Sequence, residues 1–188
     1  SGHLFPPSEN NYPSGHLFFV KQMHNKKHPL IVGCVLLGVS AIPDAMVVPV
    51  LKELTVDRFG VTQGSAHLFM AVNLLGALLA VGILALLNRR FSSSTLVLSS
   101  AALSAVLMGS MATTSSWFVM LVLRCLEGGT DLVLLAVPLR LIAASGRQNR
   151  YAGRIGAGFT VMMVSLAIGA GIGGGIGHQS VVMVLWSG

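Results

Sequence analysis

The feature that most constrains this chain is a series of apolar segments, each about twenty residues long, joined by short polar turns. About 20 apolar residues in a helix cross the roughly 30 Å hydrocarbon layer of a bilayer. A helix also satisfies its own backbone hydrogen bonds there. The sequence therefore predicts an all-α integral membrane protein, a transmembrane helix bundle over residues 29–188. Five complete helices and part of a sixth are expected at 30–51, 65–87, 95–113, 117–144, 155–176 and 180–188.

Composition excludes the other main classes of protein. Only 10% of the 188 residues are charged and 53% are hydrophobic, whereas a soluble domain carries about 25% charged residues and a disordered chain needs low hydrophobicity. Cys34 and Cys125 are isolated thiols in apolar segments, with neither a disulfide framework nor metal-ligand spacing. The sequence contains no Ser-His-acid, His-x-x-x-His or phosphate-loop pattern. We therefore expect no enzymatic activity, no cofactor and no metal.

Residues 1–28 differ from the rest of the chain. They contain three prolines, four histidines and three lysines, and they repeat the pentapeptide Ser-Gly-His-Leu-Phe at 1–5 and 14–18. The histidine spacing fits no metal-ligand pattern. We expect this segment to be a mobile cytoplasmic tail. Because the chain begins with Ser1 and stops inside an apolar run, we also expect it to be a fragment of a longer protein.

The net charge of +6 is read as a signal of membrane topology rather than of nucleic-acid binding. Short cytoplasmic loops are enriched in Lys and Arg. One side of the predicted bundle carries Lys52 and Arg58. The other side carries eight basic residues: Lys21, Lys26, Lys27, Arg89, Arg90, Arg147, Arg150 and Arg154. The N-terminus of this multi-pass protein is therefore expected in the cytoplasm, and a plasma or inner membrane is expected to hold it.

The segment 117–144 carries charges inside the predicted membrane. A charged side chain at mid-bilayer costs about 2.5–3.5 kcal/mol on insertion scales. Arg124, Glu127 and Asp131 are three and four residues apart and so share one helix face. Arg140 lies on the opposite face, nearer the cytoplasmic end, and is expected to anchor the helix at the interface.

Asp44 is the acid expected nearest to this charged face. Helix 30–51 runs outward and helix 117–144 runs inward, which places Asp44 and Arg124 at the same depth, about 10 Å below the outer surface. The matched depth favours an ion pair between them. Arg124 paired only with Glu127, one turn away in its own helix, remains an equal alternative.

Glu127 and Asp131 are the candidate proton carriers. Shielding from water disfavours the charged form of an acid, so a buried carboxyl can take up and release a proton as access alternates. In the alternative, both acids only neutralise Arg124. His67 and Asn73 are weaker candidates for the polar site, and His67 is expected at the outer interface because it lies at the start of its helix.

A glycine-rich run ends the segment 155–176. Its G-x-G-x-x-G spacing does not indicate a nucleotide site, because no strand precedes it and no acid follows Asp131. Small residues four apart let two membrane helices approach closely. The run is therefore predicted to be a packing surface and hinge, carried by Gly169, Gly173, Gly174 and Gly177.

Three motifs resemble those of the major facilitator superfamily, over residue 30 to the end of the chain. RCLEGG at 124–129 is similar to the fourth-helix motif R-x-x-[Q/E]-G-x, and the glycine run to the fifth-helix motif G-x-x-x-G-P-x-x-G-G of its antiporters. Asp44 followed by Pro49 is similar to the first-helix acid and proline. The chain departs from the family at the gate loop, Asn88, Arg89 and Arg90, where Asn88 replaces an acid. Gly174 replaces the antiporter proline.

The resemblance implies the N-terminal six-helix half of a secondary transporter that moves a small-molecule substrate by alternating access. Asp44, Arg124, Glu127 and Asp131 would form the substrate and proton pathway, and proton coupling is implied. The partners would be the lipid bilayer and a C-terminal six-helix half of the same protein. The alternative is a membrane scaffold or assembly protein on the same fold that transports nothing.

Overall fold

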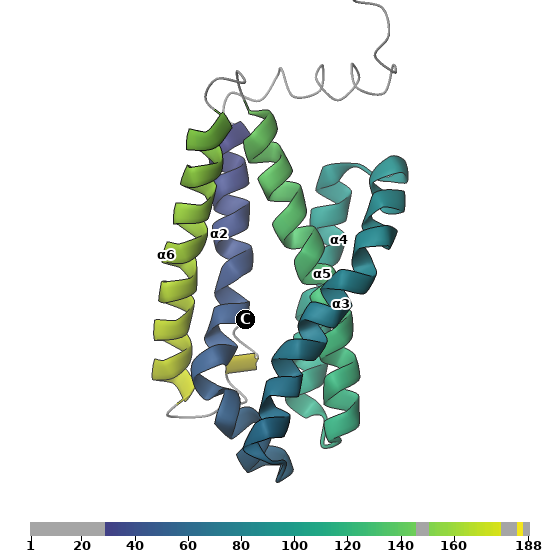
Figure 1. Cartoon of the computed structure of the whole chain (residues 1–188), viewed down its shortest axis with the longest axis vertical. Coiled ribbons are helices and arrows are strands. Elements are labelled where there is room, and N and C mark those ends of the chain that lie inside the picture. The colour runs from purple at the N-terminus through teal and green to yellow at the C-terminus, as the bar shows by residue number, and fades with distance from the viewer. Residues whose placement is uncertain (1–28, 146–150, 178–183, 186–188) are drawn as a thin grey trace, which may run out of the picture.

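The computed structural model describes residues 29–145, 151–177 and 184–185, and this part of the chain is helical without strands. A short 3₁₀ turn η1 (Val48–Val50) and a π-helical segment η2 (Glu53–Asp57) follow the first helix. The tail 1–28, Arg147 and Arg150 lie outside the described residues, as does most of the predicted helix 180–188. The five long helices are α2 (Pro29–Val47), α3 (Gln63–Arg90), α4 (Ser93–Thr113), α5 (Trp117–Ala144) and α6 (Tyr151–Gly177) (Figure 1).

Four of these helices are long and apolar enough to cross a membrane: α2 with η1, α3, α4 and α6. They indicate an integral membrane protein. The predicted span 117–144 is helix α5 over the same residues. It is not among these four helices, because it carries four charged residues. The structure thus supports five of the predicted helices and gives four of them membrane-spanning character.

Two predicted loops are wrong. Residues 52–58 were expected as an outer loop, yet helical turns continue to Asp57 and bury Leu54 and Thr55. The gate loop 88–90 was also expected outside a helix, but it forms the last turn of α3, where arginines interact favourably with the helix dipole. The chain turns only at Phe91, and Ser92 then caps α4 by accepting a hydrogen bond from the backbone N–H of Thr95.

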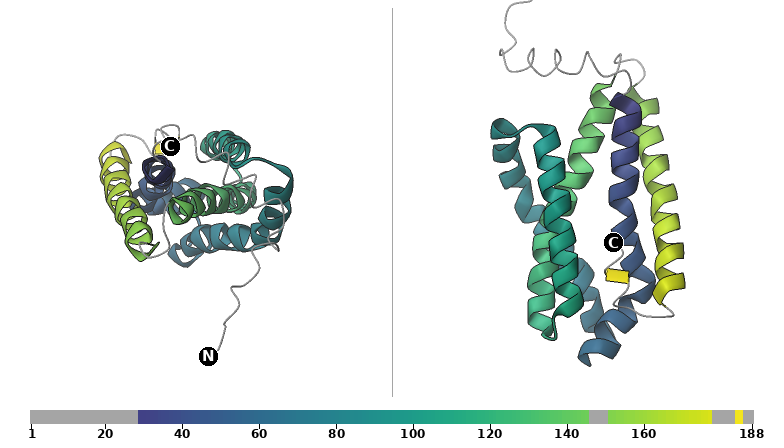
Figure 2. Two further views of the ribbon diagram at one scale, coloured as in Figure 1. Left: turned by 90° about the horizontal axis from the view of Figure 1, so that it is seen from above. Right: turned by 180° about the vertical axis from the view of Figure 1, so that it is seen from behind.

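The helices form two groups that meet along α5. Helix α2 packs against α6 and α5, while α5 packs against α3 and α4, an arrangement that is visible along the bundle axis (Figure 2). The start of α2, the end of α3 and the start of α6 lie at one end of the bundle (Figure 1). These are the ends that the charge count assigns to the cytoplasm, and the assignment itself stays a prediction.

Glycines set the contact between α6 and α2. An added Cβ at Gly169 would meet the carbonyl oxygen of Ile42, and one at Gly173 would meet the backbone of Met46. Gly177 faces the side chain of Val50. The fourth predicted packing residue, Gly174, lies beside this contact, where a Cβ would make ordinary van der Waals contact with Pro49 at 3.8 Å.

A hydrophobic cluster closes the end of the bundle where α2 finishes. Beside it, the guanidinium of Arg58 donates hydrogen bonds to the carbonyls of Met111, Ala112 and Thr114 at 3.1, 2.8 and 2.6 Å. Arg58 therefore ties the segment after α2 to the turn between α4 and α5. The buried members of the cluster are Val47, Leu54, Phe69, Met108, Met111, Ala112, Met120 and Leu185.

The glycine contact predicts a contrast between two substitutions in α6. Gly173→Ala forces α6 away from Met46 and should cost about 1–3 kcal/mol of stability, as overpacking does. A Cβ added at Gly171 would have no atom within 4 Å, so Gly171→Ala should be neutral or stabilising by up to about 1 kcal/mol. Thermal unfolding of both purified variants in detergent measures the difference, and equal loss in both would contradict the close helix contact.

Candidate functional site

The centre of the site is the side chain of Arg124, in the first half of α5. Arg124 is only 2% exposed, and its guanidinium carbon lies 4.9 Å from the centroid of the Phe69 ring on α3. A cation over an aromatic face is attracted to it. Phe69 is fully buried and belongs to the hydrophobic cluster. The ring of Phe69 thus separates the positive charge of Arg124 from the rest of the hydrophobic cluster.

Two carboxylates compensate this charge. Arg124 pairs with Glu127, which lies one turn further along α5 and is 1% exposed. Its other terminal nitrogen lies 2.9 Å from Oδ1 of Asp44 on α2, a side chain that is 36% exposed. The Asp44–Arg124 pair expected from matched depth is present, and the alternative in which Arg124 pairs only with Glu127 is wrong.

A second polar contact lies two turns along α5 from Arg124 and one turn from Glu127. The side-chain amide of Asn73 on α3 donates a hydrogen bond of 2.9 Å to Oδ2 of Asp131. Asn73 is buried and Asp131 is half-buried. Phe69 and Asn73 are four residues apart on α3, so one face of that helix supplies both the ring on Arg124 and the partner of Asp131.

Two glycines allow these short side chains to meet. A Cβ at Gly76 would overlap the backbone of Cys125, and one at Gly128 would overlap the backbone of Asn73. Helices α3 and α5 therefore cross with their backbones in contact beside the charged residues. Sequence reasoning did not assign this crossing, although Gly76 follows Asn73 by three residues and Gly128 precedes Asp131 by three.

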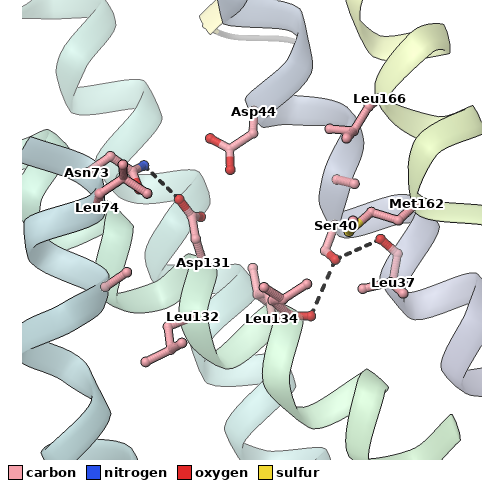
Figure 3. A pocket seen from close by; sticks show the side chains of 13 residues that line it. Leu37, Ser40, Asp44, Asn73, Leu74, Asp131, Leu132, Leu134, Met162 and Leu166 are labelled. Atoms are coloured by element: carbon pink, nitrogen blue, oxygen red, sulfur yellow. Dashed lines mark hydrogen bonds between the residues drawn. The ribbon is translucent and has the colours of Figure 1, made fainter. Parts of the chain in front are cut away.

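Two cavities open beside the network. One of about 240 Å³ is bordered by Asp44, Asn73 and Asp131, and the two carboxylates face the same space from opposite helices (Figure 3). Ser40 also borders it and donates to the carbonyls of Leu37 and Leu134. The second, of about 460 Å³, reaches Arg124 and is bordered by Leu166 and Ala170 of α6. Asp44 and Asn73 border both cavities.

The three acids are close enough together to hold a cation. Oxygens of Asp44, Glu127 and Asp131 lie within 4.8 Å of one another. Carboxylate oxygens are suitable ligands for hard cations. The guanidinium of Arg124 already pairs with two of the three groups, Asp44 and Glu127.

The remaining predicted residues lie away from this network. His67 is exposed in the first turns of α3, and Arg140 is exposed on the other side of α5. Asn88, Arg89 and Arg90 lie at the far end of α3. Phe69 was missed because nothing in the sequence of an apolar helix distinguishes a phenylalanine that contacts a cation from one that only packs in the core.

Comparisons of the chain with protein-family models, with curated proteins and with solved structures find no match.

The charge network predicts unequal effects on stability. Arg124→Gln leaves two acids without their cation, and losing one partner of a buried pair costs about 3–5 kcal/mol. Asp44→Asn should cost about 1 kcal/mol or less, because Asp44 is partly exposed and Glu127 still holds the arginine.

The double variant Asp44→Asn/Arg124→Gln tests the coupling directly. Its loss in unfolding free energy should be smaller than the sum of the single losses by about 0.5–3 kcal/mol, as for residues in contact. Arg140→Gln, on the other side of α5, is the matched control and should be additive with Asp44→Asn. Strict additivity of the Asp44 and Arg124 variants would show that the pair contributes nothing to stability.

Proposed function

We propose that this chain is the N-terminal half of a secondary transporter of the major facilitator type. It would move a small solute across a plasma or inner membrane by alternating access, coupled to protons, with its N-terminus in the cytoplasm. One observation carries the proposal: a network of one arginine and three acids lies where α2, α3 and α5 meet, beside two cavities. Arg124 and Glu127 are buried, and Asp44 and Asp131 are partly exposed.

The cost of this network is the reason to assign it a function. Ionisable groups inside membrane helices are expensive, and they mark ion or substrate pathways. A bundle that needed only to be stable would be served as well by apolar residues of similar volume, because replacing a buried ion pair in this way is often neutral or stabilising.

The placement of the network also supports movement. Asp44 lies on α2, which packs with α6, whereas Arg124 lies on α5, which packs with α3 and α4. The ion pair therefore crosses from one helix group to the other. In secondary transporters, substrate and ion sites lie near the middle of the membrane, where groups of helices rock against one another.

The competing proposal is a membrane scaffold that uses the same helices and transports nothing. The departure at the gate loop, where Asn88 replaces an acid, favours the scaffold, whereas the buried charges of α5 disfavour it. The complete reading frame discriminates between the two: a cytoplasmic linker and six further spans support a transporter, and a soluble C-terminal domain supports a scaffold.

The transport proposal is tested with the full-length protein in liposomes that contain a pH-sensitive dye. Because the acids that border the cavities outnumber the arginine, the first compound to add is an organic cation, tetraphenylphosphonium, followed by neutral and anionic solutes. We expect solute-dependent proton movement in the wild type and its loss in Glu127→Gln or Asp131→Asn.

Asp57→Asn is the matched control, since Asp57 is an exposed acid outside the long helices. It should leave proton movement unchanged. Solute movement that persists in both Glu127→Gln and Asp131→Asn would overturn the proton-coupling part of the proposal. If no solute is transported by protein whose thermal unfolding shows that it is folded, the scaffold is favoured.

A further inference from the structure

The three acids of the network do not have equivalent partners. Arg124 donates to Asp44 and to Glu127, while the hydrogen bond of Asp131 comes from the neutral amide of Asn73. Within the part of the chain that the structure describes, Asp131 makes no ion pair. We propose that Asn73 is a positioning residue that makes Asp131 the proton-carrying acid, while Asp44 and Glu127 stay charged as the counter-ions of Arg124. This assignment rests on the proposed function.

The arginine decides which acid can lose its charge. Protonating Glu127 would remove a counter-ion from a guanidinium that is almost fully buried, and a buried charge without its partner is strongly destabilising. Protonating Asp131 leaves both ion pairs of Arg124 intact. The proton is therefore held at the acid whose neutralisation disturbs the network least.

An asparagine suits both protonation states of its neighbour. Its amide N–H₂ donates to the ionised carboxylate, as in the structure. When a hydronium ion in the cavity transfers its proton to Asp131 and leaves as water, the resulting carboxyl O–H can donate to the amide oxygen of Asn73 after the amide turns over. A lysine at this position would hold Asp131 permanently charged, and a leucine would give it no partner.

The backbone contact between α3 and α5 keeps this partner in place. Gly128 lies against the backbone of Asn73, so the two helices are close enough for the short side chain of Asn73 to reach Asp131. The carboxyl of Asp131 borders the cavity of about 240 Å³ together with Asp44 (Figure 3). Asp131 is therefore held by one neighbour and accessible from one cavity.

Charged groups face Asp131 from two of the helices around it. They are Asp44 on α2 and Arg124 and Glu127 on α5. Helix α3 contributes the neutral Asn73, and α6 contributes only apolar residues to the shared cavity, Met162 and Leu166. The charge state of Asp131 therefore depends on the arginine and on the two acids that the arginine holds.

The test uses a carbodiimide, which reacts with carboxyl groups that carry a proton in apolar surroundings. The full-length protein in detergent is treated with dicyclohexylcarbodiimide over a range of pH, and modification of each acid is quantified by mass spectrometry. In the wild type we expect Asp131 to be labelled. The extent of its labelling should fall as the pH rises, and the pH at half-maximal labelling is the labelling midpoint. Labelling of Asp44 and Glu127 should not exceed that of Glu53 and Asp57, the exposed acids of the same chain.

Asn73→Leu removes the donor that favours the charged form of Asp131. The labelling midpoint of Asp131 should then move about one pH unit upward, the size expected for a hydrogen bond to a charged group. Asn73→Gln keeps the amide and should leave a smaller shift. Leu75→Ala, at an exposed position on the same helix, is the control for altered packing and should leave the midpoint unchanged.

Three results would overturn the assignment. They are preferential labelling of Glu127 or Asp44 in the wild type, an unchanged Asp131 midpoint in Asn73→Leu, and an equal shift in Leu75→Ala. The wild-type pattern needs no variant, so poor folding of Asn73→Leu does not prevent the test. Proton transport with the label on Glu127 would refute this inference alone, whereas a label on Asp131 without any transport would refute the proposed function alone.

Discussion

The structure depends on the burial of one positive charge. Removing a guanidinium from water costs several kcal/mol, and Arg124 offsets this cost with Glu127 on its own helix, Asp44 on α2 and the ring of Phe69 on α3. Each contact requires a helix to lie at a particular depth and rotation. The arrangement of α2, α3 and α5 around this residue is therefore an electrostatic requirement as much as a consequence of packing.

Glycine makes that arrangement possible. Asp and Asn side chains are short, so two helices that carry them must approach closely before the polar groups can meet. Gly76 and Gly128 bring α3 onto α5, and Gly169 and Gly173 bring α6 onto α2. Close approach is the usual role of small residues between membrane helices. Here the contact between α3 and α5 also brings Asn73 within hydrogen-bond distance of Asp131.

Much of this could be predicted from the sequence, for identifiable reasons. Long apolar runs located the helices to within a few residues. Equal depth in the membrane indicated the Asp44–Arg124 pair, with pairing of Arg124 to Glu127 alone as an equal alternative that the structure excludes. The segment 52–58 was misread because its polar residues are typical of loops, although Leu54 and Thr55 are buried. The crossing at Gly76 and Gly128 could not be predicted, because one glycine in an apolar helix does not indicate which neighbour it meets. The side of the membrane and the solute stay predictions.

The hydrogen bonds of Arg58 have a consequence for how deeply the turn after α4 can lie. With 21 residues, α4 is about 31 Å long, barely the thickness of the hydrocarbon layer. The last four carbonyls of a helix have no hydrogen-bond partner within the helix. Arg58 donates hydrogen bonds to the carbonyls of Met111, Ala112 and Thr114. A turn of only three residues can therefore lie at the hydrocarbon boundary without leaving these carbonyls unpaired in lipid.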